Sequence, residues 1–161
     1  MIKAVVQENI PECVDVIRTS FRTVADQLGF TEENAPGFTA FATDELRLNY
    51  QYREEKRPMF AYFDGERIVG YYSLLRLDDN SFELNNLCTL PEYRHRGIGE
   101  KLLEHAFAEA SNAGCSLMRI GIVEENRVLR AWYESHGFVH LGAKKSERFP
   151  FTCGFMERAL D

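Results

Sequence analysis

A glycine-rich turn between a strand-like run and an amphipathic helix constrains the fold of this chain more than any other feature. Residues 82–90 are largely apolar, and Pro91 ends the run. After the turn, apolar side chains recur at three- and four-residue steps until Gly114, as in an amphipathic helix that ends at a glycine. The sequence therefore predicts a strand, a tight turn and a helix in direct succession. The turn itself reads Arg94, His95, Arg96, Gly97, Ile98 and Gly99.

The start of that helix is suited to bind an anion. The first N–H groups of a helix have no acceptor within the helix, and the helix dipole is positive at that end. Gly97 and Gly99 lack a Cβ that would block a phosphate, and Arg94 and Arg96 can add charge-assisted contacts. We therefore expect a pyrophosphate to bind on residues 94–99. A tight turn without a ligand is the alternative.

Two motifs together resemble the GNAT superfamily of acyl-CoA-dependent N-acyltransferases. The turn has the spacing Arg-x-x-Gly-x-Gly of that family's coenzyme A pyrophosphate loop, and it lacks the endings of the P-loop and of the dinucleotide fingerprint. Downstream, Asn126 opens a second motif that ends in Tyr-Glu-x-x-Gly-Phe at residues 133–138. The resemblance implies that acetyl-CoA is the acyl donor and that an acetyl group is transferred to a primary amine by direct attack in a ternary complex.

The order of predicted elements is β-α-α-β-β-β-α-β-α-β-β. It predicts an α/β fold with a mixed, mostly antiparallel sheet and helices on both faces, and the resemblance adds a splayed strand pair. The length of 161 residues suits one domain that covers residues 1–161. The predicted strands are 2–7, 59–63, 68–77, 82–90, 116–123, 138–141 and 151–157, and the helices begin near residues 9, 44, 98 and 126.

Composition and charge narrow the partners. The chain is 45% hydrophobic and 27% charged, has no apolar run long enough to span a membrane, and carries a formal net charge of −6. The negative charge argues against nucleic acid and suits an amine acceptor, either a small molecule or a peptide. Residues 1–6 do not read as a signal peptide, so we expect a cytoplasmic protein, as a monomer or homodimer. The scattered cysteines and histidines predict no metal site.

Tyr133 and Glu83 are the candidate catalytic residues. The resemblance implies that Tyr133 points at the coenzyme sulfur and assists the departing thiolate, whereas a tyrosine on an apolar helix stripe is otherwise a core residue. Glu83 stands where the family often places a carboxylate that takes a proton from the acceptor ammonium. The alternative for Glu83 is a surface pair with an arginine such as Arg76.

The strand before the turn carries further cofactor-binding candidates. By the resemblance, the N–H of Leu87 or Cys88 meets the thioester oxygen, and Thr89 pairs with the pantetheine arm. Two adjacent asparagines, Asn85 and Asn86, are unusual in a central strand and indicate a polar cleft, with a solvated bulge as the alternative. Asn126 is a good helix cap, and the resemblance gives it a second role as a hydrogen-bond partner of pantetheine.

The acceptor site is the least determined part of the sequence. Residues 30–33, 38–41 and 149–151 combine phenylalanines with two glutamates and would suit a cation with an apolar body. The alternative is that the phenylalanines pack into a core, and in that case the next candidates lie near Arg47 and Tyr50. A non-catalytic module that binds acyl-CoA as a sensor or scaffold is the rival to an enzyme.

Overall fold

All 161 residues are described by a computed structural model, in which seven strands form one sheet in the order β1-β2-β3-β4-β5-β7-β6. Neighbouring strands run antiparallel except β4 and β5, which are parallel. This confirms the mixed, mostly antiparallel sheet. The strands are β1 Ile2–Ala4, β2 Met59–Asp64, β3 Arg67–Asp78, β4 Ser81–Thr89, β5 Leu117–Val123, β6 Val139–Lys145 and β7 Thr152–Ala159.

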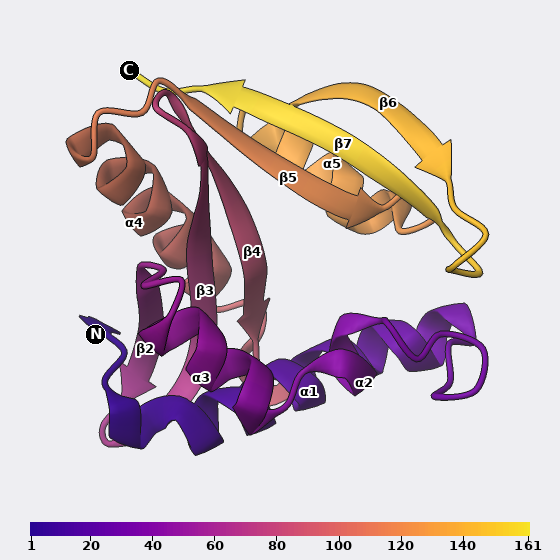
Figure 1. Ribbon diagram of the computed structural model, residues 1–161, viewed down its shortest axis with the longest axis horizontal. Helices are drawn as coiled ribbons and strands as arrows, with labels where there is room; N and C mark the ends of the chain where they lie inside the picture. The colour runs from indigo at the N-terminus through magenta and orange to yellow at the C-terminus, as the bar shows by residue number, and fades with distance from the viewer.

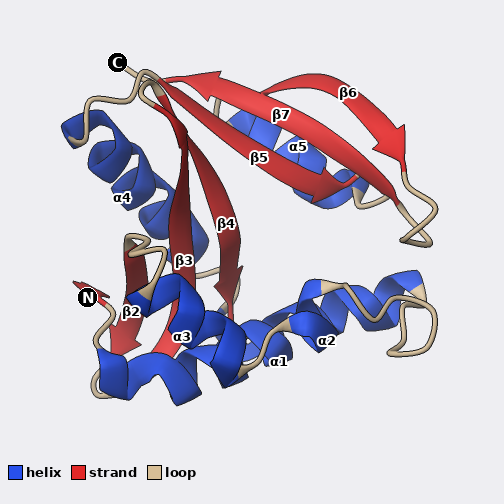
Figure 2. Cartoon of the chain, viewed as in Figure 1, coloured by secondary structure: helices blue, strands red, loops and turns tan.

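Helices cover both faces of the sheet (Figure 2). Side chains alternate between the two faces of the sheet along β3, so the neighbouring residues Tyr71 and Tyr72 point toward different helices. The Tyr72 hydroxyl shares a 2.7 Å hydrogen bond with His105 Nδ1 of α4, whereas Tyr71 faces Cys13 of α1. The helices are α1 Ile10–Leu28, α2 Thr39–Ala42, α3 Glu45–Arg53, α4 Ile98–Asn112 and α5 Arg127–Ser135, with 3₁₀ turns η1 Gln7–Asn9 and η2 Pro91–Tyr93.

The sheet splits between β4 and β5 (Figure 1). These strands pair only where residues 81–83 lie beside residues 117–119, and they then diverge. Before the far end of β4, its register against β3 shifts, and Asn86 adopts the left-handed conformation with φ 56°. The splayed pair expected from the resemblance is therefore present. The adjacent asparagines mark a bulge in the pairing of β4 with β3, in the part of β4 that has already separated from β5.

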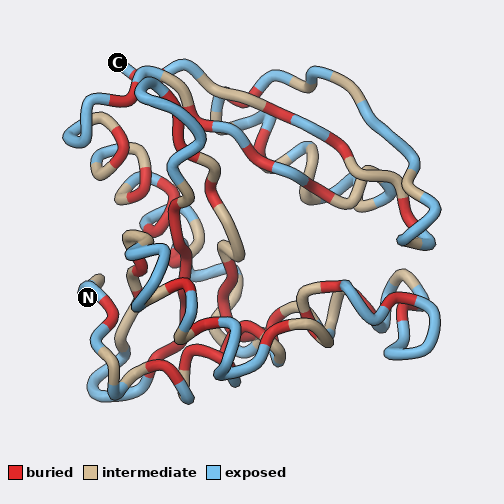
Figure 3. Tube along the Cα trace, in the orientation of Figure 1, coloured by how far each residue is buried: buried red, intermediate tan, exposed pale blue.

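Two apolar clusters hold the fold together (Figure 3). The larger one has 31 buried residues and joins the sheet to α1 and α4. The smaller one joins the segment between α1 and α2 to the loop between β6 and β7, because Phe151 packs against Phe30 and Phe38 with ring centroids 5.0 and 5.9 Å away. These phenylalanines are buried in each other, so the packing alternative holds, and they do not form an open wall for an acceptor.

The first helix begins near residue 9, as predicted, but Asn9 does not cap it. The Asn9 side chain makes no cap bond to α1 and instead accepts from the Val6 N–H at 2.9 Å. Glu12 accepts from the Ile68 N–H of β3 at 2.8 Å. A contact with the sheet has replaced the local one, and β1 ends at Ala4, earlier than expected. None of the helices has the length and apolarity that crossing a bilayer requires.

Candidate active site

The turn before α4 presents a row of free backbone donors. Gly97 is the N-cap of α4 with φ 80°, and His95 is also left-handed with φ 63°. The N–H groups of residues 95–100 donate to no acceptor in the protein, since the first helical bond runs from the Lys101 N–H to the Gly97 carbonyl oxygen. Successive N–H groups in such a turn form an anion-binding concavity, so the geometry suits a pyrophosphate.

The two arginines of this turn have different environments. Arg94 is held by the protein: its guanidinium donates to the Ser20 carbonyl oxygen at 2.9 Å, to Thr23 Oγ1 at 3.0 Å and to the Thr89 carbonyl oxygen at 3.2 Å. Arg96 lies over the ring of Tyr93, with 5.0 Å between its Cζ and the ring centroid, and makes no ion pair. The structure therefore gives Arg94 a positioning part and leaves Arg96 as the charged group available to a phosphate.

Gly99 lies where α4, α5 and β4 converge. A Cβ at this position would be 3.7 Å from the Trp132 ring and 3.9 Å from Thr89 Oγ1. Ile98, the first residue of α4, is buried beneath the turn and fixes its position on the core. The absence of a side chain at Gly99 thus keeps a narrow space open between the loop, Thr89 and Trp132.

The main chain of β4 faces the splay on one side. The Leu90 N–H donates to the Val69 carbonyl oxygen of β3 at 2.8 Å. Because N–H directions alternate along a strand, the Cys88 N–H also points toward β3, and the N–H groups of Leu87 and Thr89 point toward the open side. Of the two residues proposed for the thioester oxygen, Leu87 is therefore better oriented.

Cys88 is a buried, neutral thiol. Burial raises the pKa of this thiol to about 12, and desolvation is the largest cause. Cys13, which lies nearby across the sheet face, has its pKa raised to about 12 for the same reason. A thiol that stays protonated at neutral pH is a poor nucleophile, so Cys88 is not prepared to carry an acyl group.

Tyr133 comes from α5 and is buried, with its ring between Trp132 at 5.0 Å and Phe138 at 5.3 Å. Burial raises the pKa of its phenol, and the neighbouring Cys88 adds a smaller contribution in the same direction. The hydroxyl has no hydrogen-bond partner in the protein. The group is thus a protonated donor on a ring that is fixed by packing.

Asn126 caps α5, because its Oδ1 accepts from the Leu129 N–H at 3.2 Å. The local role expected for this residue is therefore confirmed. Arg130, one turn further on, pairs with Glu124 at 3.4 Å and Glu134 at 3.6 Å, as expected for a surface arginine. Both contacts stiffen the start of the helix that carries Tyr133.

Glu83 is part of a polar chain that sequence reasoning missed. Its Oε1 accepts from Asn85 Nδ2 at 2.8 Å, and Asn85 Oδ1 in turn accepts from Arg57 at 2.8 Å. Arg57 also pairs with Glu55 at 3.1 Å. Arg76 instead lies over the Phe82 ring and bonds to backbone carbonyls, so the surface pair with Glu83 does not form. The only sequence signal was the polar pair at 85–86.

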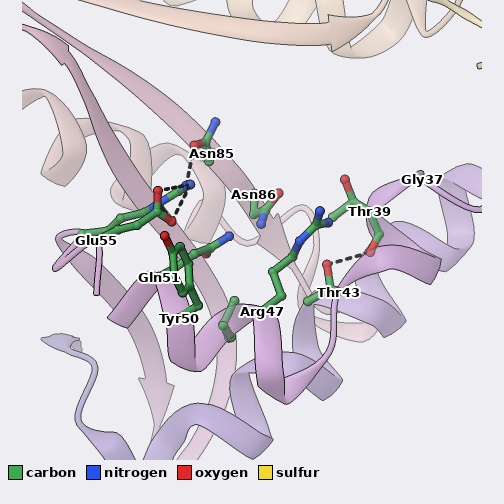
Figure 4. A pocket seen from close by; sticks show the side chains of 11 residues that line it. Gly37, Thr39, Thr43, Arg47, Tyr50, Gln51, Glu55, Asn85 and Asn86 are labelled. Atoms are coloured by element: carbon green, nitrogen blue, oxygen red, sulfur yellow. Dashed lines mark hydrogen bonds and ion pairs between the residues drawn. The ribbon is translucent and has the colours of Figure 1, made fainter. Parts of the chain in front are cut away.

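A polar cavity of about 400 Å³ lies between α3 and the bulge of β4 (Figure 4). Arg47 and Tyr50, the second-choice acceptor residues, line it together with Asn85 and Asn86. Glu32 and Glu33 do not line it. The cavity therefore lies beside the part of β4 that precedes Leu87.

Comparisons with known proteins agree with this geometry. Residues 27–138 match the family model described as the acetyltransferase (GNAT) family. The fold, with its splayed strands and free helix start, has the form of an acyl-CoA-dependent transferase. The chain belongs to the GNAT acetyltransferase family.

Similar sequences carry related names. An uncharacterized N-acetyltransferase of Lactobacillus delbrueckii subsp. lactis is 28% identical over 148 residues, covering 84% of this chain and 82% of that protein. One of Mycobacterium tuberculosis is 36% identical over 78 residues, covering 48% of this chain and 49% of the relative, so this match spans about half the length of that protein.

Solved structures show the same fold. The PaiA N-acetyltransferase of Thermoplasma acidophilum, in complex with coenzyme A, superposes with a TM-score of 0.82 at 21% identity and covers 99% of this chain and 98% of that one. The ribosomal-protein-S18-alanine N-acetyltransferase of Escherichia coli gives 0.76 at 18% identity, covering 100% and 94%.

Proposed function

We propose that the protein transfers an acetyl group from acetyl-CoA to the primary amine of a small-molecule or peptide acceptor, by direct attack in a ternary complex. The observation that carries the proposal is the row of unpartnered N–H groups at residues 95–100, next to the open edge of β4. This arrangement provides hydrogen-bond donors for a pyrophosphate and, further along, for an extended amide-containing arm. Acetyl-CoA supplies the activated acyl group as a thioester.

The residues around the splay have distinct parts in this proposal. The N–H groups of residues 95–100 hold the phosphates, with Arg96 adding charge. Thr89 pairs with the pantetheine arm and Asn126 lies near it, while the Leu87 N–H stabilises charge that develops on the thioester oxygen. The Tyr133 phenol donates a hydrogen bond to the departing sulfur. This requires a neutral phenol, which burial favours.

The state of Cys88 supports direct attack. An acyl-enzyme route needs a nucleophile that is activated, and the Cys88 thiol is neutral and buried. The acceptor amine must instead be deprotonated in place. Glu83 has one carboxylate oxygen bonded to Asn85, and we assign the proton transfer to its other oxygen, through water.

The test is release of free thiol from acetyl-CoA in the presence of a panel of amines, with the acetylated product identified by mass spectrometry. We expect release that depends on both protein and amine. Longer acyl-CoA donors in the same assay measure the acyl-chain preference. Tight binding of coenzyme A with no turnover of any amine would overturn the proposal and favour a sensor or scaffold that binds acyl-CoA.

A further inference from the structure

Arg47 is a free cation in the wall of the polar cavity. It stands on the first turn of α3, and Figure 4 shows its side chain reaching up from the helix toward Asn86 and Thr39. No carboxylate lies within ion-pair distance of it, although other arginines near the splay, such as Arg57, are paired. A guanidinium with no protein partner in a concave site is a ready partner for a carboxylate.

Gln51 supplies a second unpaired group one turn further along α3. The residue is only 8% exposed and lines the same cavity, yet its Oε1 has no hydrogen-bond partner. That oxygen has almost no accessible surface, whereas the amide nitrogen Nε2 is accessible and donates to no acceptor in the protein. At the cavity wall this nitrogen is therefore free to donate a hydrogen bond to a ligand. Residues four apart on a helix lie on one face, which places Gln51 beside Arg47.

The remaining charges in the cavity are already neutralised. Glu55 is the only carboxylate among the lining residues, and Arg57 holds it at 3.1 Å. A second cationic group on a ligand would meet the positive charge of Arg47 without a free carboxylate to offset it. The cavity thus offers one positive charge and one nearby N–H donor, and its volume is at the low end for small-molecule sites.

We infer that the acceptor is a small amine that also carries a carboxylate, such as a free amino acid. Its carboxylate pairs with Arg47 and accepts a hydrogen bond from Gln51 Nε2, next to the bulge of β4. The inference rests on the proposed function and names its substrate class. It replaces the cationic acceptor expected from the glutamates and phenylalanines. A peptide amino terminus and a polyamine have no carboxylate near the amine that could pair with Arg47.

The experiment compares each of a panel of amino acids with its own carboxamide, which keeps the amine and removes the negative charge. We expect kcat/KM for the best amino acid to exceed that of its carboxamide about tenfold or more. Arg47→Gln should bring the ratio close to one by raising KM for the amino acid, and Arg47→Lys should retain part of it. Arg53→Gln is the matched control, because Arg53 lies on the same helix but bonds to Gln7, outside the cavity.

The two hypotheses fail in different ways. If no amine is acetylated, the proposed function is wrong. If amines are acetylated but the wild-type ratio is near one, or polyamines or peptide amino termini are preferred, the function stands and the inference about the carboxylate is overturned. The wild-type ratio decides this even if Arg47→Gln fails to fold.

Discussion

The guanidinium of Arg94 donates a 2.9 Å hydrogen bond to the carbonyl oxygen of Ser20, a residue 74 positions earlier in the chain. With its bonds to Thr23 and Thr89, it fastens the turn before α4 to α1 and to the end of β4. The N–H groups that we propose to hold a pyrophosphate are therefore fixed in place by a side chain that bonds to α1 and β4.

Arg94→Ala should lower the free energy of unfolding by about 2 kcal/mol or more, because it removes three hydrogen bonds from a charged group, among them the one to the Thr89 carbonyl oxygen. Chemical denaturation measures this change. Arg96→Ala is the control, since Arg96 only stacks on Tyr93 and its loss should change stability by about 0.5 kcal/mol or less. Equal stability of the two variants would contradict the positioning part of Arg94.

Gly97→Val should weaken coenzyme A binding about tenfold or more in calorimetry. At φ 80° a branched side chain is strained, and it also stands where a phosphate approaches the free N–H groups. Gly114→Val, at the other end of α4 with φ 85°, carries the same strain away from the turn and should leave the affinity unchanged. An unchanged affinity for coenzyme A in Gly97→Val would contradict the proposal that a phosphate binds at this turn.

Tyr133→Phe should lower kcat about tenfold or more, with the dissociation constant for coenzyme A nearly unchanged, because only the hydroxyl is lost and the ring still packs on Trp132 and Phe138. The raised pKa keeps the wild-type phenol protonated, so Tyr133 should cause no loss of activity below about pH 10. Equal kcat in the two proteins would make Tyr133 a core residue only.

Glu83→Gln should lower kcat/KM and change its dependence on pH, because the amide cannot accept the ammonium proton. The pH profile of the initial rate measures this. Asn85→Asp tests the chain to Arg57 separately, since it leaves Glu83 in place and changes only its neighbour. A wild-type profile in Glu83→Gln would assign the base to water or to the substrate.

The stability of the fold should fall as pH rises above about 8.5, where cysteine thiols of the unfolded chain begin to ionise. In the folded protein the pKa values of Cys13 and Cys88 are raised to about 12, so both thiols stay protonated there, and the unfolded state alone gains from ionisation. Denaturation at pH 8 and pH 10 measures the slope. The double variant Cys13→Ala with Cys88→Ala should show a shallower slope, and the same slope as wild type would contradict the assignment.

Local signals in the sequence were sufficient for the turn before α4 and for the order of all strands and of every α-helix except the short α2. Helical spacing, Gly114 and the glycines of the turn act over a few residues, and the structure places these elements as predicted. The short helix α2 was not predicted, and β6 extends beyond the predicted strand 138–141. These residues form regular structure only through contacts with distant parts of the chain.

The contacts at the site depend on such distant neighbours. Nothing near Arg94 indicates that its partner is Ser20, and no spacing reveals that Asn85 joins Glu83 to Arg57. The phenylalanines of two separate segments bury each other for the same reason. A charged or aromatic residue can be found from the sequence, but the partner it selects is a property of the fold.

The smaller apolar cluster joins its two segments by side chains alone. No backbone hydrogen bond links residues 30–42 to residues 146–151, so the contact of Phe151 with Phe30 and Phe38 joins the segment after α1 to the loop between β6 and β7 through side chains. Separating these phenylalanines exposes apolar surface but breaks no strand pairing. Local opening at this point therefore has a free energy below that of global unfolding, and hydrogen exchange there should be faster than in β3 and β4.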